Sequence, residues 1–183
     1  QNFKVEPSLI NSITKIINNT SLDSLKFISC LDDDTLNQLI PKISVLEKYQ
    51  KIPIIEFSQA SSSILDHLSA FKNTKKLILQ NCDIEILSFF ESLSDLGSIQ
   101  IESIDLTGNT CTESGTKPIS FPPLLNEIIL DEVQFEFSEF VNLFTSLMNH
   151  SSQENNSYQV SLANISLKDS EWAQFLSKIN SVP

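Results

Sequence analysis

Arginine is absent from this sequence, and all 12 basic residues are lysines. Arginine is the side chain most used for bidentate phosphate recognition and for stabilising a phosphoryl group in transfer. Glycine occurs only at Gly97, Gly108 and Gly115, so no glycine-rich phosphate loop can form. His67 and His150 have no nucleophile paired with them, and we interpret each as a surface residue rather than a general base or ligand. The sequence therefore lacks the signatures of an enzyme, and we predict no cofactor and no metal site.

Long apolar runs and an excess of positive charge are also missing. No apolar run approaches the roughly 18 to 20 residues needed to cross a bilayer, and the opening segment QNFKVEPSLI does not resemble a signal peptide. The net charge is −11, so phosphate groups would be repelled rather than gathered. We expect no nucleic-acid partner, no membrane insertion and a cytoplasmic location.

The cysteines and the glycosylation triplets agree with this location. The cysteines Cys30, Cys82 and Cys111 are odd in number and widely spaced, which favours free thiols in a reducing compartment over a disulfide framework. Asn-x-Ser/Thr triplets begin at Asn18, Asn19, Asn149, Asn155 and Asn164. A chain rich in Asn and Ser produces such triplets by chance, so we interpret them as background rather than as glycosylation sites.

A short apolar pattern recurs along the chain. In LILQNCDIEIL, Leu77 and Leu79 alternate as in a strand, and Cys82 follows where the chain must turn. The same spacing occurs in LDSLKFISC, IPIIEFSQA, IESIDLTGN, LNEIILDEV and SYQVSLANI, at steps of 22 to 32 residues. Strands are predicted to centre on 25–27, 55–57, 77–79, 104–106, 128–130 and 160–162. Cys30, Cys82 and Asn109 share one position, which indicates a role in the turn.

Apolar residues at helical spacing fill most of the intervening segments, namely 7–17, 61–71, 85–93, 135–147 and 172–179. Two segments depart from this pattern. Residues 110–123 contain one glycine and three prolines, which predicts an extended connection, and residues 149–157 are predicted to form a polar loop. The run LDDDT lacks the spacing of a cation site, so we expect Asp34 to cap a helix there.

These motifs, chiefly LILQNCDIEIL and IDLTGNTC, resemble leucine-rich-repeat proteins of the ribonuclease-inhibitor-like class over roughly residues 22–170. The resemblance implies an α/β solenoid, or horseshoe, with an inner parallel sheet and a mostly helical outer face. Residues 1–183 would form one domain of about six irregular repeats. Members of this class are intracellular and bind proteins on the concave face. Within it, the chain resembles the repeats of CARMIL-type actin-regulatory scaffolds.

The sequence departs from this family pattern in three respects. Ala60 and Val133 replace the Asn or Cys of the turn. The tail through which CARMIL proteins bind capping protein has no counterpart in these residues. Ran GTPase-activating proteins share the repeat class, but their catalytic arginine has no possible equivalent here.

We therefore expect a non-catalytic scaffold that binds a protein partner, with cytoskeletal regulation as the role implied by the resemblance. A GTPase-activating or other catalytic repeat protein and a structural spacer remain as alternatives. The expected concave-face residues are Lys26, Glu56, Lys76, Ile78, Asp105, Glu127, Ile129, Asp131 and Glu132, with Ser161 at the end of the row. The acids would attract a basic segment and the isoleucines would anchor it, unless the face is ordinary solvated sheet. Neither end looks like a polar cap, which suggests an excerpt of a longer solenoid or self-association through apolar ends.

Overall fold

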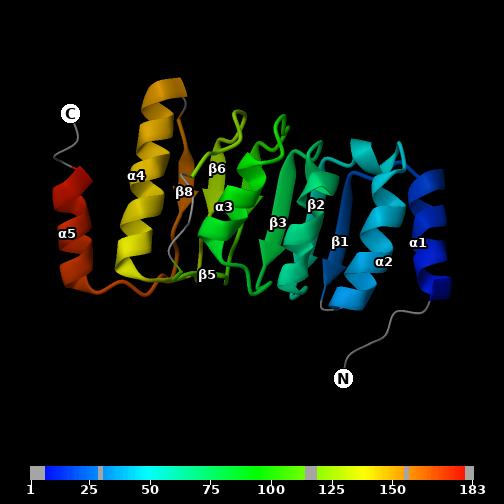
Figure 1. The fold of residues 1–183 in the computed structure, drawn as a ribbon, viewed down its shortest axis with the longest axis horizontal. Coiled ribbons are helices and arrows are strands. Elements are labelled where there is room, and N and C mark those ends of the chain that lie inside the picture. The colour runs from blue at the N-terminus through cyan, green and yellow to red at the C-terminus, as the bar shows by residue number, and fades with distance from the viewer. Residues whose placement is uncertain (1–6, 29–30, 114–118, 155–156, 180–183) are drawn as a thin grey trace.

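Residues 7–28, 31–113, 119–154 and 157–179 are described by a computed structural model, which has an α/β architecture with one layer of strands and one layer of helices (Figure 1). The elements are α1 (Pro7–Asn19), β1 (Ser24–Ile28), α2 (Asp33–Ser44), η1 (Tyr49–Lys51), β2 (Ile54–Ser58), η2 (Ser62–Phe71), β3 (Lys76–Gln80), α3 (Ile86–Ser94), β4 (Ser103–Asp105), β5 (Thr110–Cys111), β6 (Glu127–Ile129), β7 (Gln134–Phe135), α4 (Phe137–Glu154), β8 (Gln159–Ser161) and α5 (Asp169–Ile179).

Six strands form a single parallel sheet in the order β1-β2-β3-β4-β6-β8, so each strand of this sheet pairs with the next one along the chain. The register keeps equivalent residues in step: Leu25 pairs with Ile55, Ile55 with Leu77, and Leu77 with Ile104. The predicted strand centres and their parallel pairing are confirmed, with shifts of one or two residues at the ends. The helices lie on one side of this sheet (Figure 1).

Alternation along each strand builds the core between the two layers. Ile55, Phe57, Leu77 and Leu79 are fully buried, whereas Ile78 between them is only half-buried. Successive strand side chains point to opposite faces, so each apolar pair turns toward the helices and the residue between them turns away. The sheet therefore has one covered face and one open face.

Among the described residues, the same turn follows β2, β3, β4, β6 and β8. Its central residue, which we call the turn residue, lies two positions after the second buried strand residue and has a positive φ. The turn residues are Gln59, Asn81, Gly108, Glu132 and Asn164, with φ of 57°, 52°, 71°, 58° and 58°. The backbone N–H of each of the first four donates to a carbonyl in the following turn, at 2.8 to 2.9 Å. These bonds extend the regularity of the sheet into the connections.

Asn109 and Cys82 complete the buried interior of two neighbouring turns. Asn109 is 1% exposed, and its amide nitrogen donates to the carbonyls of Leu79 and Leu106 at 2.7 and 2.8 Å. The Cys82 thiol donates to the carbonyl of Gln80 at 3.3 Å. Burial raises the pKa of the Cys82 thiol to about 11, which makes it a poor nucleophile. The predicted structural role of Cys82 in the turn is confirmed.

The other cysteines complete this picture. Cys82 and Cys111 are free thiols, as predicted, and both are buried, which also raises the pKa of the Cys111 thiol. Cys30 lies outside the described residues. Cys111 belongs to the two-stranded parallel sheet β5-β7, which the sequence pattern did not indicate.

Three local predictions need correction, and a fourth is confirmed. Residues 149–154 are helical and extend α4, and His150 on this extension contacts Phe121 and Tyr158. Asp32, not Asp34, caps α2: its backbone is extended and its carboxylate accepts from the N–H of Thr35 at 2.9 Å. Residues 62–71 wind as a 3-10 helix rather than an α-helix. The connection at 110–123 contains no helix in its described part, as predicted.

Candidate functional site on the open face of the sheet

The candidate site is the open face, defined by strand side chains that point away from the helices. Its central row is fixed by the register, which aligns Lys26 with Glu56, Glu56 with Ile78, Ile78 with Asp105, Asp105 with Ile129 and Ile129 with Ser161. A second row aligns Lys76, Ser103, Glu127 and Gln159. Seven of the nine predicted site residues lie in these two rows, and Asp131 and Glu132 follow β6. The sequence prediction of a shared face agrees with this register.

Lys26 and Glu56 form an ion pair at the β1 end of the central row. Their nitrogen and oxygen atoms are 2.6 Å apart, and the Glu56 side chain is 11% exposed against 55% for Lys26. Because the lysine lies in solvent, the pair contributes little to stability beyond orienting the glutamate. This end of the face is therefore close to electrically neutral.

Lys76, Ser103 and Glu127 form a second cluster, in the row beside Ile78. Lys76 Nζ lies 3.2 Å from Glu127 Oε2, and the Ser103 hydroxyl donates to the same oxygen. The hydrogen bond from Ser103 and, second, the hydrogen bond from Lys76 lower the pKa of Glu127. Glu127 is held ionised and in place across three strands.

Asp105 and Asp131 are both used in hydrogen bonds on the face. Asp105 is 7% exposed, accepts from Gln80 Nε2 at 2.7 Å and accepts from the hydroxyl and N–H of Thr107 at 2.6 and 3.0 Å. Asp131 Oδ1 accepts from the Ser161 hydroxyl and the Ala163 N–H, each at 2.7 Å. These two carboxylates are therefore fixed acceptors, whereas Glu132 is exposed at its turn.

Ile78 and Ile129 supply the apolar part of the central row. Both are half-buried, and each lies one strand from Asp105 on opposite sides of it. Neighbouring strands are about 4.8 Å apart, so the two isoleucines lie roughly 10 Å apart across the sheet. In the middle of the open face, an acidic side chain therefore lies between two aliphatic side chains.

Sequence reasoning missed the polar neutral residues that hold these acids, namely Gln80, Ser103 and Thr107. Each lies two residues before or after a residue of the central row, so the strand period would have placed it on the same face. Their type gave no signal, because serine, threonine and glutamine are common on any surface.

The histidines lie away from the open face. Nε2 of His67 is 3.0 Å from Oδ1 of Asn37, a contact between η2 and α2. His150 was predicted to be a surface residue in a loop, but it is half-buried on α4, hydrogen-bonded to the hydroxyl of Tyr158 and 5.6 Å from the Phe121 ring centroid. Its position follows from the extension of α4 past residue 149.

In the parts of the chain that the structure describes, no group of three or more His, Cys, Asp or Glu side chains could hold a metal ion. None of the helices in the same residues is both long and apolar enough to pass through a bilayer.

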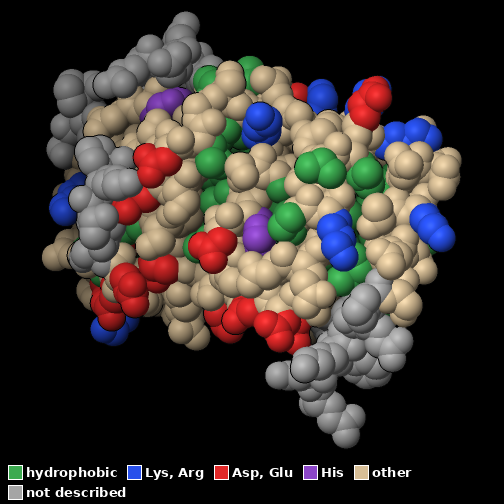
Figure 2. Space-filling model, turned by 45° about the vertical axis from the view of Figure 1, so that its right-hand side comes forward, with side chains coloured by type: hydrophobic (Ala, Val, Ile, Leu, Met, Phe, Trp, Pro, Cys, Tyr) green, Lys and Arg blue, Asp and Glu red, His purple; other side chains and the backbone are tan. Residues whose placement is uncertain are grey.

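The helix side of the molecule has a different surface. Acidic side chains gather along its lower border in Figure 2, and hydrophobic side chains appear there only as small separate patches. Negative charge is therefore not confined to the open face. Charge alone would not select the open face for a basic partner, whereas the ordered central row distinguishes it.

The chain matches no protein-family model, no curated protein and no solved structure.

Proposed function

We propose that this chain is a non-catalytic protein-interaction scaffold of the leucine-rich-repeat type, a horseshoe whose open face binds a segment of a protein partner. The recurring turn supports the repeat architecture, because the turn residue occupies one position in five successive units. Asn109 supports it further, since its amide joins two neighbouring turns from the position that Asn or Cys holds in such repeats.

The central row is the single observation that carries the binding proposal. It places Ile78, Asp105 and Ile129 side by side on a face that no described helix covers. A polyproline-II segment has three residues per turn and advances about 3.1 Å per residue, so one that crosses the strands would bring residues i and i+3 over the two isoleucines. The partner that fits carries aliphatic residues three apart, with lysine or arginine between or beside them.

The fixed acids explain why such a partner would bind selectively. Glu127 and Asp105 already have their geometry set by neighbouring side chains, so binding costs little conformational entropy on this side. Electrostatic attraction would mainly raise the association rate and make it sensitive to salt. A GTPase-activating activity has no support in these contacts, because no described residue on the face is an arginine or an unpaired nucleophile.

Selection from a displayed library of random peptides tests the proposal without a known partner. The protein is used as bait, and binders are counter-selected on the double variant Ile78→Ser/Ile129→Ser. We expect peptides with two aliphatic residues three apart and a basic residue nearby, bound at least about tenfold more weakly by the double variant, or roughly 1.4 kcal/mol. Val45→Ser is the matched control, because Val45 is 80% exposed and lies after α2.

The outcome must be read together with thermal unfolding of each variant. A double variant that melts like the parent and still binds the selected peptides equally well contradicts the open-face proposal. Peptides without basic residues, bound equally at low and high salt, contradict the charge part of the proposal alone.

A further inference from the structure

The outer edge of β8 is the last strand edge of the six-stranded sheet. On the side of β8 that faces β6, the N–H of Gln159 donates a hydrogen bond. The carbonyls of Ser161 and Ala163, the residue after Leu162, accept hydrogen bonds on the same side. In a parallel ladder the backbone groups of alternate residues point to opposite neighbours. The N–H and C=O groups of Val160 and Leu162 therefore point outward, where the described residues provide no further strand.

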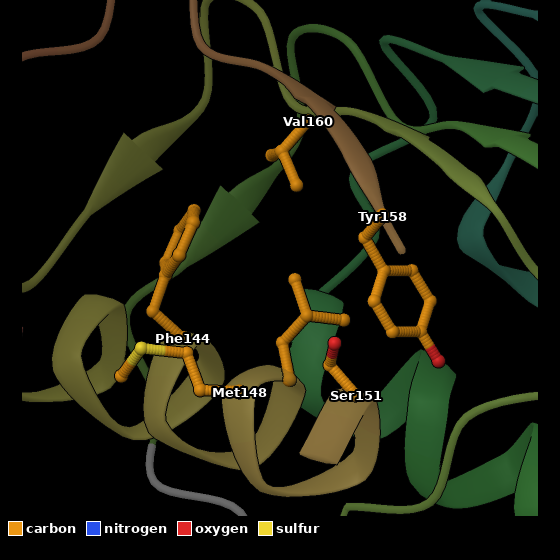
Figure 3. A pocket seen from close by; sticks show the side chains of 6 residues that line it. Phe144, Met148, Ser151, Tyr158 and Val160 are labelled. Atoms are coloured by element: carbon orange, nitrogen blue, oxygen red, sulfur yellow. The ribbon is translucent and has the colours of Figure 1, made fainter. Parts of the chain in front are cut away.

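An apolar pocket of about 240 Å³ lies directly beside this edge, between α4 and β8 (Figure 3). Phe144, Met148 and Ser151 line it from α4, and Val160 points toward them from the strand. Small-molecule sites usually enclose roughly 300 to 1,000 Å³, so this space suits one or two aliphatic side chains better than a complete ligand. Val160 and Leu162, the inward residues of β8, are only half-buried, unlike their counterparts on inner strands.

β8 is a short edge strand of three residues that carries neither a charge nor a proline. Proteins protect exposed sheet edges with charged residues, proline, bulges or very short strands, and β8 has the short length without the charge or the proline. Residues 157–166, SYQVSLANIS, contain neither a charged residue nor a proline. The opposite edge strand, β1, has Lys26 at its centre and Asp23 just before it. The two sheet edges therefore differ in charge, and the β8 edge offers backbone groups flanked by uncharged side chains.

The helix layer determines what can pair there. Along the long axis of the molecule, α5 lies farther out than β8, and at the other end α1 lies farther out than β1 (Figure 1). A second copy that extended the sheet from either of its edges would bring its own outlying helices against α4 and α5. An added strand that carries no helix meets no such obstacle.

We propose that the β8 edge binds an extended segment of another protein, which adds to the sheet as a parallel seventh strand. The segment is uncharged over about four residues, because the edge offers no charge to pair with. It carries aliphatic residues at i and i+2, one of which enters the pocket beside Val160, while its backbone pairs with Val160 and Leu162. This site is independent of the open face and does not require the proposed scaffold function.

A synthetic peptide that copies residues 157–166 is the probe, because it has the aliphatic spacing of the strands already present. Hydrogen exchange of the intact protein is measured with and without it. We expect exchange at the Val160 and Leu162 amides to slow by at least about tenfold when the peptide binds. A peptide N-methylated at the positions copied from Gln159 and Ser161 should not bind, since those amides would face β8. The matched peptide, N-methylated at the positions copied from Val160 and Leu162, should bind normally.

A pocket variant gives a second, independent measurement. Met148→Trp should fill the pocket and weaken the peptide by at least about tenfold, while Val45→Trp, at an exposed distant site, should have no effect. Thermal unfolding shows whether the Met148→Trp variant remains folded. If it does not, the comparison of the two methylated peptides on the unmodified protein tests the proposal.

Three results would overturn the proposal. One is the absence of peptide binding at millimolar concentration. Another is equal binding of the two methylated peptides. The last is slow hydrogen exchange of the Val160 and Leu162 amides in the protein without peptide. If that protection increases with protein concentration, a second copy occupies the edge. If it does not change with concentration, the protein's own chain occupies the edge.

Discussion

Oδ1 of Asn109 accepts a hydrogen bond from the backbone N–H of Cys82, 3.0 Å away, and so joins the turn after β4 to the turn after β3. The same oxygen accepts from the N–H of Ile84 at 3.1 Å. One buried side chain thus satisfies backbone groups from two neighbouring units. Loss of that side chain should affect both units together.

Asn109→Ala should lower the free energy of unfolding by about 3 kcal/mol or more, because at least two buried N–H groups and two carbonyls lose their partner. Urea unfolding measures the change. Asn126→Ala, at an exposed position, is the control and should change stability by less than about 0.5 kcal/mol. Equal effects of the two variants would show that the buried amide does not join the turns.

Gly108→Ala should destabilise the protein more than Gly97→Ala. Both glycines have a φ of 71°, so both variants incur the backbone cost of roughly 1 to 2 kcal/mol. Only at Gly108 would the added Cβ also collide with the side chain of Asn81, whereas nothing lies within 4 Å at Gly97. Adding Asn81→Gly to Gly108→Ala should recover part of the loss. If the two single variants unfold at the same urea concentration, the close packing of these turns is not significant.

Tyr49→Phe should leave stability unchanged or raise it by about 1 kcal/mol. Tyr49 is 1% exposed, its hydroxyl has no hydrogen-bond partner among the described residues, and burial raises the pKa of that hydroxyl. Tyr158→Phe is the matched change at a hydroxyl bonded to His150, and it should lower the melting temperature. A marked loss of stability in Tyr49→Phe would reveal a partner for this hydroxyl.

Stability should decline in alkali partly through Cys82. Burial raises the pKa of its thiol to about 11 from the ordinary value of 9.0, so the unfolded state releases this proton first as pH increases. The contribution is complete below about pH 8.5 and is lost as pH rises toward the folded value. Urea unfolding between these pH values should show a shallower decline in Cys82→Ala. Parallel curves for the two proteins would contradict a protected thiol.

The pKa of the Glu127 carboxyl should lie below its ordinary value of 4.5, because hydrogen bonds from Ser103 and then Lys76 stabilise the charged form. Its contribution to stability is therefore present above the unfolded pKa and is lost as pH falls through the folded one. Carboxyl chemical shifts measured by NMR follow this titration. Ser103→Ala should raise the midpoint more than Lys76→Met, and the reverse order would mean that the ion pair dominates.

The strand positions could be predicted because the relevant information is local. Leu77 and Leu79 alternate with Ile78 in the sequence itself, and a period of two specifies which side chains share a face. Asn109 and Cys82 stand at the same offset from their strands, so their role in the turns was also readable. The order of residues in the central row, from Lys26 to Ser161, can be predicted once these strand positions are combined with parallel pairing of equivalent residues.

Other features depended on contacts between distant residues. The extension of α4 past Asn149 accompanies the contact of His150 with Phe121 and Tyr158, and polar composition alone favoured a loop there. The short sheet β5-β7 joins residues about 24 apart through backbone groups, which carry no side-chain signal.

The sequence by itself determined the order, spacing and inward face of the strands, because the alternation of apolar residues is a property of each short segment. Only the tertiary structure decided which acids on the open face are engaged: Glu127 and Asp105 look alike in the sequence, yet each is fixed by partners on other strands. It also decided that the two sheet edges differ, since Val160 becomes an edge residue only through its place at the end of the strand order. Local patterns specify how a chain alternates, whereas exposure, pairing and edges arise only when distant segments are brought together.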